Sequence, residues 1–228
     1  MFVRVVIPGY FDEGYIVPGG SSKGIPLNIP KENILIDHKP SLVALDSSKA
    51  SVIKIVKARS WHEHFKHLWQ HSRIHKEVKG NYLMNRLGFR VPEIYSVGYR
   101  ILPDLRNGSL GFYQMENMSL SGFRTVRDLF DNGEIILDQR ELVLKSILEG
   151  LSVLMRNRIV FTDFHLENVM MNEQGELVWM DTGVTTFSLF SGKKFKRKHN
   201  HSLERFSTYY SENYFTEPEK ELIRALKL

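Results

Sequence analysis

The stretch that decides the fold is VFTDFHLENVMMNEQGELVWMDTG, residues 160–183. Asp163 is followed five residues later by Asn168, and an apolar strand comes next. After turn residues at 172–175, a second apolar strand leads into Asp181, Thr182 and Gly183. Two short apolar runs around a polar, glycine-containing turn predict a β-hairpin. The sequence therefore places an acid and an amide before this hairpin and a second acid directly after it.

These three polar residues favour phosphoryl transfer when they are read together. A carboxylate at Asp163 can accept the proton that an acceptor hydroxyl loses. Asn168 and Asp181 supply the amide and carboxylate oxygens that Mg²⁺ prefers as ligands. Taken singly, each of them is typical of a turn or a helix cap. That structural interpretation stays open for every residue alone, whereas the order and spacing favour the chemical one.

The segment resembles the catalytic and metal-binding loops of the protein-kinase-like superfamily, with Asp163 at the base position. His165, where protein kinases have lysine, is similar to the aminoglycoside and sugar phosphotransferase branches. Over about residues 33–183 the chain resembles the lipopolysaccharide-core kinases, which phosphorylate heptose or Kdo sugars. The resemblance implies an ATP-dependent kinase in which Asn168 and Asp181 bind Mg²⁺. It also implies that His165 positions the acceptor or Asp163.

The fold class that the resemblance implies is α+β, in the two-lobe arrangement of protein kinases. An N-terminal arm (1–30) would precede an N-lobe (31–116) with an antiparallel sheet and one key helix. A short, mostly helical C-lobe (117–228) would follow. The pattern predicts strands over residues 33–37, 42–45, 51–56, 95–99, 111–115, 169–171 and 177–180. It predicts helices over residues 61–87, with a break near Ser72, and over 125–130 and 140–158. In the last helix the side chains expected to face inward are Leu142, Ile147, Leu151 and Leu154.

A lysine lies inside the apolar strand 52–56. An unpaired ammonium there would be costly to bury, so Lys54 needs a carboxylate partner unless its side chain is exposed. Glu77 is the favoured partner because it shares a helix face with Ile74 and Met84. Glu63, on the preceding helical segment, is the alternative. By resemblance, Lys54 holds the ATP phosphates and Glu77 positions it.

By resemblance, the hinge between the lobes runs through residues 115–118, where backbone groups at Glu116 and Met118 would meet the adenine. One departure concerns the turn 37–41, which contains no glycine and therefore lacks the usual phosphate-covering loop. A pseudokinase scaffold without catalytic activity consequently stays open as an alternative.

The acceptor is expected to be small, because the chain ends at residue 228, too soon after Gly183 for a peptide-docking region. A sugar of an anionic glycolipid is favoured; a soluble small molecule or a protein seryl or threonyl group remains the alternative. The basic run 193–198, followed by His199 and His201, is typical of a solvated face or of a surface that meets an anionic partner. No nucleic acid is expected as a partner.

The bulk properties indicate a cytoplasmic protein, either free or in peripheral contact with the inner face of the cytoplasmic membrane. The chain of 228 residues has no cysteine, a net charge of +5 and no signal-peptide pattern. It also lacks an apolar run of about 18 residues that could span a membrane. The histidines at 64, 67, 71 and 75 allow a metal site on one helix face, although a polar helix face is favoured.

Overall fold

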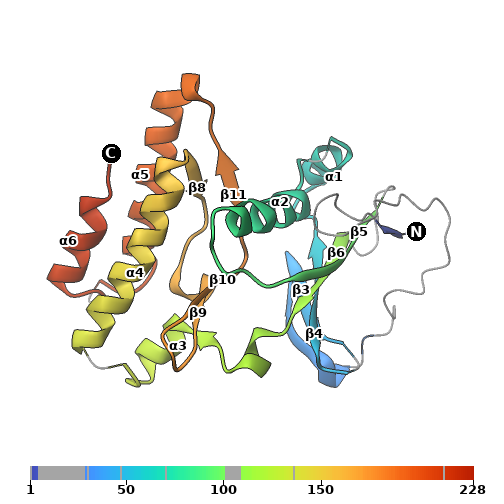
Figure 1. Cartoon of the computed structure of the whole chain (residues 1–228). Helices are drawn as coiled ribbons and strands as arrows, with labels where there is room; N and C mark the ends of the chain where they lie inside the picture. Colours follow the sequence, from blue (N-terminus) through green and yellow to red (C-terminus); the bar gives the residue numbers. More distant parts are fainter. Residues whose placement is uncertain are drawn as a thin grey trace. The chain divides into compact units, whose positions relative to one another are not determined.

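The computed structural model describes residues 2–4, 29, 31–46, 48–69, 71–100, 109–135, 137–212 and 214–228. The chain divides into two compact units. The first comprises Met1–Tyr82 and Pro92–Ser121, and the second comprises Leu83–Val91 and Gly122–Leu228. The described residues form a mixed α+β structure with antiparallel sheets and six α-helices (Figure 1).

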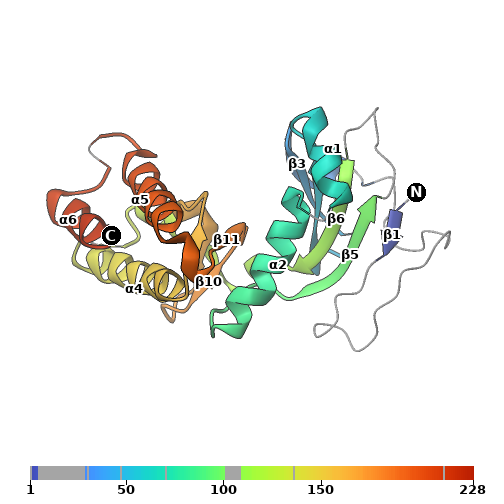
Figure 2. The ribbon, with the colours of Figure 1, turned by 90° about the horizontal axis from the view of Figure 1, so that it is seen from above.

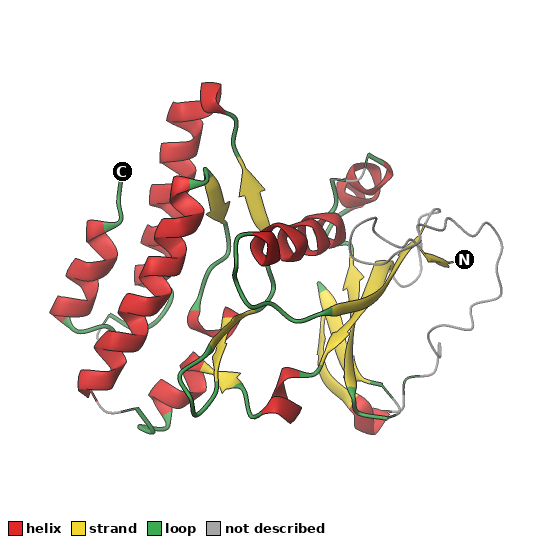
Figure 3. Ribbon diagram, in the orientation of Figure 1, coloured by secondary structure: helices red, strands yellow, loops and turns green. Residues whose placement is uncertain are grey.

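The first unit is built on a six-stranded antiparallel sheet in the order β1-β5-β6-β4-β3-β2. Figure 3 draws the strands of this sheet in yellow. Its strands are β1 (Phe2–Arg4), β2 (Ile34–His38), β3 (Ser41–Leu45), β4 (Ser51–Lys57), β5 (Ile94–Arg100) and β6 (Ser109–Glu116). The five strands predicted in this region are confirmed with small shifts at their ends. Phe2–Arg4, at the start of the expected N-terminal arm, pair with β5. Apart from Ile29, the rest of that arm lies outside the described residues.

Two helices confirm the predicted break near Ser72; the first lies in the first unit, and the second crosses into the second unit at Leu83. They are α1 (Trp61–Leu68) and α2 (Arg73–Arg86). The hydroxyl of Ser72 lies 2.9 Å from Nδ1 of His67 and 2.8 Å from Nδ1 of His75. A metal site on one helix face is not formed, because α1 ends before His71 and that histidine leaves the helix. His67 and His75 instead form a polar network around this serine.

The second unit contains two small sheets, in the orders β10-β9-β7 and β11-β8. Its strands are β7 (Arg124–Thr125), β8 (Ile159–Phe161), β9 (Val169–Met171), β10 (Leu177–Trp179) and β11 (Val184–Thr186). Its helices are α3 (Val126–Asp131), α4 (Leu137–Arg156), α5 (Gly192–Thr208) and α6 (Glu217–Ala225). Helix α6 contacts both α4 and α5, and the three lie side by side in Figure 2. The predicted hairpin is β9–β10.

The core of the second unit contains the inward face of α4 and a cluster of aromatic rings. Ile147, Leu151 and Leu154 are buried, as predicted. Leu142 is 62% exposed, so its predicted inward position is wrong. Leu142 lies five residues before Ile147, and each residue turns the helix by about 100°. Leu142 is therefore roughly 140° away from Ile147 around the helix axis. The rings of Phe161, Phe164, Trp179 and Phe206 pack against one another beneath the loop that follows β8.

Candidate active site

The β9–β10 hairpin fixes where two of the predicted metal ligands leave the sheet. Val169 pairs with Trp179, and the backbone N–H of Met180 donates to the carbonyl oxygen of Asn168 at 2.7 Å. Asn168 directly precedes β9. Asp181 follows Met180, and therefore comes two residues after the end of β10. Both residues therefore leave the same end of the hairpin.

The loop between β8 and β9 is closed by the side chain of Asn168. Its Nδ2 donates to the backbone carbonyl oxygen of Asp163 at 2.9 Å, and its backbone N–H donates to His165 at 2.9 Å. Asn168 is buried, whereas the carboxylate of Asp163 is exposed. No described residue donates to Oδ1 of Asn168, so this amide oxygen remains as an acceptor. The loop is thus rigid at its base and presents a carboxylate to solvent.

An arginine that the sequence did not single out contacts the predicted base. Nη2 of Arg205, on α5, lies 2.8 Å from Oδ1 of Asp163. Both side chains are about half exposed, and exposed ion pairs contribute only about 0–1 kcal/mol to stability. The pair can therefore open at little cost. Nothing in the sequence pattern indicates it, because the two residues lie on different elements.

His165 is held by a carboxylate and by an aromatic ring. Its Nδ1 lies 2.7 Å from Oε2 of Glu167. Its ring stacks on Tyr209 with 4.8 Å between centroids and 7° between planes. Because an ionised carboxylate only accepts hydrogen bonds, Nδ1 carries a proton and Nε2 is the second ring nitrogen available to a partner. This arrangement fixes the orientation and the tautomer of His165.

Glu167 organises several side chains of the second unit, and it too was missed by the sequence. Nη1 of Arg127 lies 2.9 Å from Oε1, and the hydroxyl of Tyr210 donates to Oε2 at 2.8 Å. Burial raises the pKa of Glu167, but the hydrogen bonds from His165 and Tyr210 outweigh it and lower the pKa to about 2. Glu167 is therefore anionic at neutral pH. Its only sequence signal is its position two residues after His165.

Asp181 sits in a strained turn directly after β10. Its φ of +46° lies in the left-handed region, which aspartate tolerates better than most residues. The backbone N–H of Gly183 donates to Asp181 at 2.6 Å, and the N–H of Val184 donates to the buried Thr182 at 2.8 Å. The hydroxyl of Thr162 donates to the carbonyl oxygen of Gly183 at 3.1 Å. These bonds hold the Asp181 turn against the segment that precedes Asp163.

The residues at this end of the hairpin include oxygen atoms of the kinds that magnesium takes as ligands. Mg²⁺ is usually held by one or two carboxylates together with substrate phosphates and water. Asp181 offers one carboxylate, and Asn168 offers the amide oxygen described above. Within the described ranges there is no cluster of three or more His, Cys, Asp or Glu side chains that could hold a metal by protein alone.

The buried ion pair predicted for Lys54 is present in the first unit. Nζ of Lys54, on β4, lies 3.2 Å from Oε2 of Glu77, on α2, and the two residues are 4% and 7% exposed. The hydroxyl of Tyr113 donates to Oε2 at 2.9 Å, and Nε of Arg73 lies 3.2 Å from Oε1. Glu63, the alternative partner, instead accepts the backbone N–H of Arg59 at 2.8 Å.

The glycine-free turn between β2 and β3 is tied to the same helix. The carbonyl oxygen of Pro40 accepts the backbone N–H of Lys57 at 3.0 Å and Nη2 of Arg73 at 2.9 Å. Arg73 therefore links the turn to Glu77 through a single guanidinium group. The hydrogen bond from the Arg73 side chain thus holds this turn.

Of the two residues predicted at the hinge, Glu116 ends β6 and Met118 follows it outside the sheet. The N–H of Glu116 donates to the carbonyl oxygen of Glu93 at 2.9 Å, so this N–H is already used inside the unit. Met118 is buried at the start of a short 3₁₀ helix, Met118–Ser121. Nδ2 of Asn117 donates to the carbonyl oxygen of Lys49 at 2.9 Å. The segment is fixed by its own contacts up to the boundary after Ser121.

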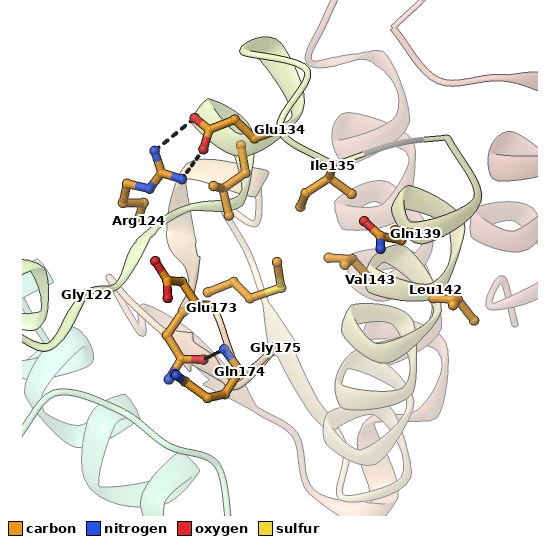
Figure 4. A pocket seen from close by; sticks show the side chains of 13 residues that line it. Gly122, Arg124, Glu134, Ile135, Gln139, Leu142, Val143, Glu173, Gln174 and Gly175 are labelled. Atoms are coloured by element: carbon orange, nitrogen blue, oxygen red, sulfur yellow. Dashed lines mark hydrogen bonds and ion pairs between the residues drawn. The ribbon is translucent and has the colours of Figure 1, made fainter.

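A pocket of about 750 Å³ lies in the second unit between the β9–β10 turn and α4. Figure 4 shows the Arg124 and Glu134 ion pair on one side and the 173–175 turn on another. The exposed Leu142 belongs to its lining. None of the predicted site residues lines it. The pocket is therefore separate from the Asp163 loop.

Comparison with protein-family models finds no match for this chain, and comparison with curated proteins finds no similar sequence. No helix in the described part of the chain is both long enough and apolar enough to cross a membrane.

Proposed function

We propose that the chain is an ATP-dependent phosphotransferase of the protein-kinase-like fold that phosphorylates a sugar hydroxyl of the lipopolysaccharide inner core, heptose or Kdo. The observation that carries the proposal is the closure of the Asp163 loop by Asn168, with Asp181 at the same end of the hairpin. The buried Lys54–Glu77 pair supports it independently. The first unit corresponds to an N-lobe and the second to a C-lobe in this proposal.

Asp163 is the proposed general base. Its exposed carboxylate can receive the proton of the acceptor hydroxyl, while the bond from Asn168 fixes the loop that carries it. His165, oriented by Glu167 and Tyr209, positions the acceptor or Asp163 through its Nε2. Arg205 must release or share the Asp163 carboxylate when the acceptor binds. Opening this ion pair costs little free energy, because both side chains are exposed.

Asn168 and Asp181 are the proposed Mg²⁺ ligands, and Lys54 is the proposed contact to the ATP phosphates. Mg²⁺ and a lysine neutralise charge on the transferring phosphoryl group in kinases. Glu77 keeps the Lys54 ammonium in place, because both charges are buried and paired. The segment at Glu116 and Met118 is the proposed adenine contact. Dependence on ATP makes the cytoplasm the proposed location.

The test is transfer of labelled phosphate from ATP to three acceptors: purified core glycolipid, soluble sugars and generic protein substrates. Transfer to the glycolipid is expected, and Asp163→Asn should lower its rate by about 10²–10⁴-fold. Glu212→Gln, an exposed acid outside the motifs, is the matched control and should keep full activity. Full transfer by Asp163→Asn would remove Asp163 from the base role. Preferential transfer to another acceptor would replace the glycolipid assignment.

A pseudokinase scaffold is distinguished by ligand binding. A ligand that binds only the folded state raises the melting temperature, so ATP with Mg²⁺ should stabilise the protein. Asp181→Asn should weaken this stabilisation, because it removes the proposed carboxylate ligand. Absence of both stabilisation and transfer would favour the scaffold.

A further inference from the structure

Two large apolar side chains are presented to solvent between β11 and α5. Phe190 is 100% exposed and Leu189 is 81% exposed. They occupy a short 3₁₀ helix, Leu189–Ser191, at the uppermost part of the second unit in Figure 1. Single exposed apolar residues are ordinary on protein surfaces, whereas contiguous exposed apolar surface marks interaction sites. We call residues 189–190 the apolar tip.

The apolar tip is held in place by hydrogen bonds on its flanks. Nε of Arg158 donates to the carbonyl oxygen of Ser188 at 3.1 Å, and the N–H of Phe187 donates to the carbonyl oxygen of Arg158 at 3.0 Å. The side-chain hydroxyls of Ser188 and Ser191 lie 3.0 Å apart, and the N–H of Ser191 donates to Ser188 at 3.1 Å. The backbone that carries the two exposed apolar side chains is therefore held by hydrogen bonds on both sides.

The basic run follows the apolar tip directly on α5. Five basic side chains of its first half are exposed: Lys193, Lys194, Lys196, Arg197 and Lys198. The chain contains no acidic residue between Asp181 and Glu204. The opposite face of α5 packs inward through Phe195, His199 and Leu203, and Nε2 of His199 bonds to Leu226 at 2.9 Å. The helix thus has one structural face and one strongly positive face.

This charge opposes the stability of the helix that carries it. The N-terminus of a helix has a partial positive charge, so cations near it are unfavourable and acids are favoured. The first turn of α5 contains no acid, and the side chain of Ser191 does not cap it. The local sequence is therefore poor for helix initiation and good for attracting an anion. Such conflicts between local stability and sequence are expected at functional surfaces.

We propose that the apolar tip and the basic face of α5 form a docking surface for an anionic phospholipid bilayer. Leu189 and Phe190 enter the boundary between headgroups and acyl chains, while the adjacent lysines and arginine meet lipid phosphates. Apolar insertion combined with basic residues is the usual composition of peripheral membrane contacts. Nucleic acid phosphates would attract the same charges but would leave the exposed apolar pair without a role.

The position of α5 relates this surface to the Asp163 loop. From Lys193 to Arg205 the helix rises about 18 Å at roughly 1.5 Å per residue, and Arg205 contacts Asp163. A bilayer held at the tip therefore lies on the order of 20 Å from Asp163. If the proposed function holds, the acceptor sugar lies at this height above the lipid phosphates. The docking proposal itself does not depend on any catalytic activity.

The test uses the full chain with vesicles of phosphatidylcholine alone or with about 30% phosphatidylglycerol at ~0.1 M salt. Sedimentation should show binding to the anionic vesicles that is lost at high salt. The double variant Leu189→Ser/Phe190→Ser should bind about tenfold less tightly or worse. Lys193→Ser/Lys194→Ser should lose about fivefold for each lysine. Neither variant should lower the melting temperature, because the substituted side chains are exposed.

Matched controls are available elsewhere on the surface. Leu120→Ser removes a 68% exposed leucine, and Lys66→Ser/Lys76→Ser removes two exposed lysines. Both should retain parental binding. Since the chain has no cysteine, Phe190→Cys accepts a single polarity-sensitive fluorophore that should report an apolar environment on anionic vesicles, whereas Leu120→Cys should not. The proposal is overturned if the Leu189→Ser/Phe190→Ser variant binds vesicles as tightly as the parent protein. It is also overturned if the protein binds no vesicles, or binds DNA or RNA instead of them.

Discussion

The side-chain amide of Asn168 donates to the backbone carbonyl oxygen of Asp163 at 2.9 Å, across a loop of five residues. The bond joins a buried residue to an exposed one, so the interior of the second unit fixes the position of a solvent-facing carboxylate. Without the amide, the Asp163 carbonyl oxygen would lose this partner. The same residue thus serves loop geometry through Nδ2 and the proposed metal contact through Oδ1.

Asn168→Ala should therefore lower stability as well as phosphoryl transfer. Loss of a hydrogen bond with a part-buried carbonyl left behind costs about 1–3 kcal/mol. Asn157→Ala is the control, because its Nδ2 also donates to a backbone carbonyl but at an exposed site. Urea denaturation should show a lower midpoint for the first variant and a change within about 0.5 kcal/mol for the second. Equal midpoints would mean that the Asp163 loop does not depend on this bond.

The Lys54–Glu77 pair should respond unequally to loss of each partner. In Lys54→Met, the Glu77 carboxylate keeps Arg73 and the Tyr113 hydroxyl, so the loss of stability should be modest. In Glu77→Leu, several buried or part-buried donors lose a common acceptor, and the cost should approach about 3–5 kcal/mol. The double variant should cost less than the sum of the single variants. Additive costs in denaturation would show that the two residues are not coupled.

Stability should fall as the pH is lowered from about 6.5 towards 4 because of His75. Burial, with the nearby His67, lowers the pKa of His75 to about 4 in the fold. The unfolded chain therefore takes up a proton that the folded chain resists, and stability is lost through this window and levels off below it. His75→Gln should flatten the dependence, whereas the exposed His62→Gln should not. An unchanged slope in His75→Gln would assign the dependence elsewhere.

Glu167 should dominate a second, more acidic window. Its pKa of about 2 in the fold lies below the ordinary value of 4.5, so its stabilising effect is present above pH 4.5 and is lost as the pH falls towards 2. Glu167→Gln keeps the shape of the side chain but removes the titration. Denaturation at pH 5 and pH 3 should differ less in this variant than in the parent protein. A Glu167→Gln variant with the parental difference would contradict this role.

Gly150→Ala should destabilise the second unit although alanine is the better helix former. A Cβ at position 150, on α4, would lie 2.4 Å from Cζ2 of the buried Trp179 and 3.2 Å from Cε1 of Phe89. Overpacking of this kind costs about 1–3 kcal/mol. Gly192→Ala, at the start of α5, meets no atom within 4 Å and should not destabilise the protein. Thermal unfolding of the two variants gives the comparison.

The parts of this structure that could be predicted from the sequence are those with a strong local pattern. Helix periodicity placed Glu77 on the face that reaches Lys54, and alternating apolar runs around turns predicted most strands. The inward position predicted for Leu142 was wrong, because its apolar side chain was counted with the buried face although its place around the helix lies away from that face. The α+β class that the resemblance implied agrees with these elements.

The surroundings of Asp163 and His165 could not be predicted, for a different reason. Arg205 meets Asp163 from α5, and Tyr209 and Tyr210 reach His165 and Glu167 from the end of the same helix. These contacts join residues about 40 positions apart and depend on how α5 packs against β8. A pattern of spacings carries no information about such packing, so the supporting residues of the site emerge only in three dimensions.

The serine between α1 and α2 determines how protons are arranged on two histidines. A hydroxyl has one hydrogen, so Ser72 can donate to Nδ1 of His67 or of His75 but not to both. At least one ring must then carry its own hydrogen on Nδ1 and donate to the serine oxygen. Nitrogen chemical shifts of the two imidazoles should therefore reveal at least one Nδ1–H form. A neutral ring of that form has no hydrogen on Nε2, so this second nitrogen can only accept a hydrogen bond.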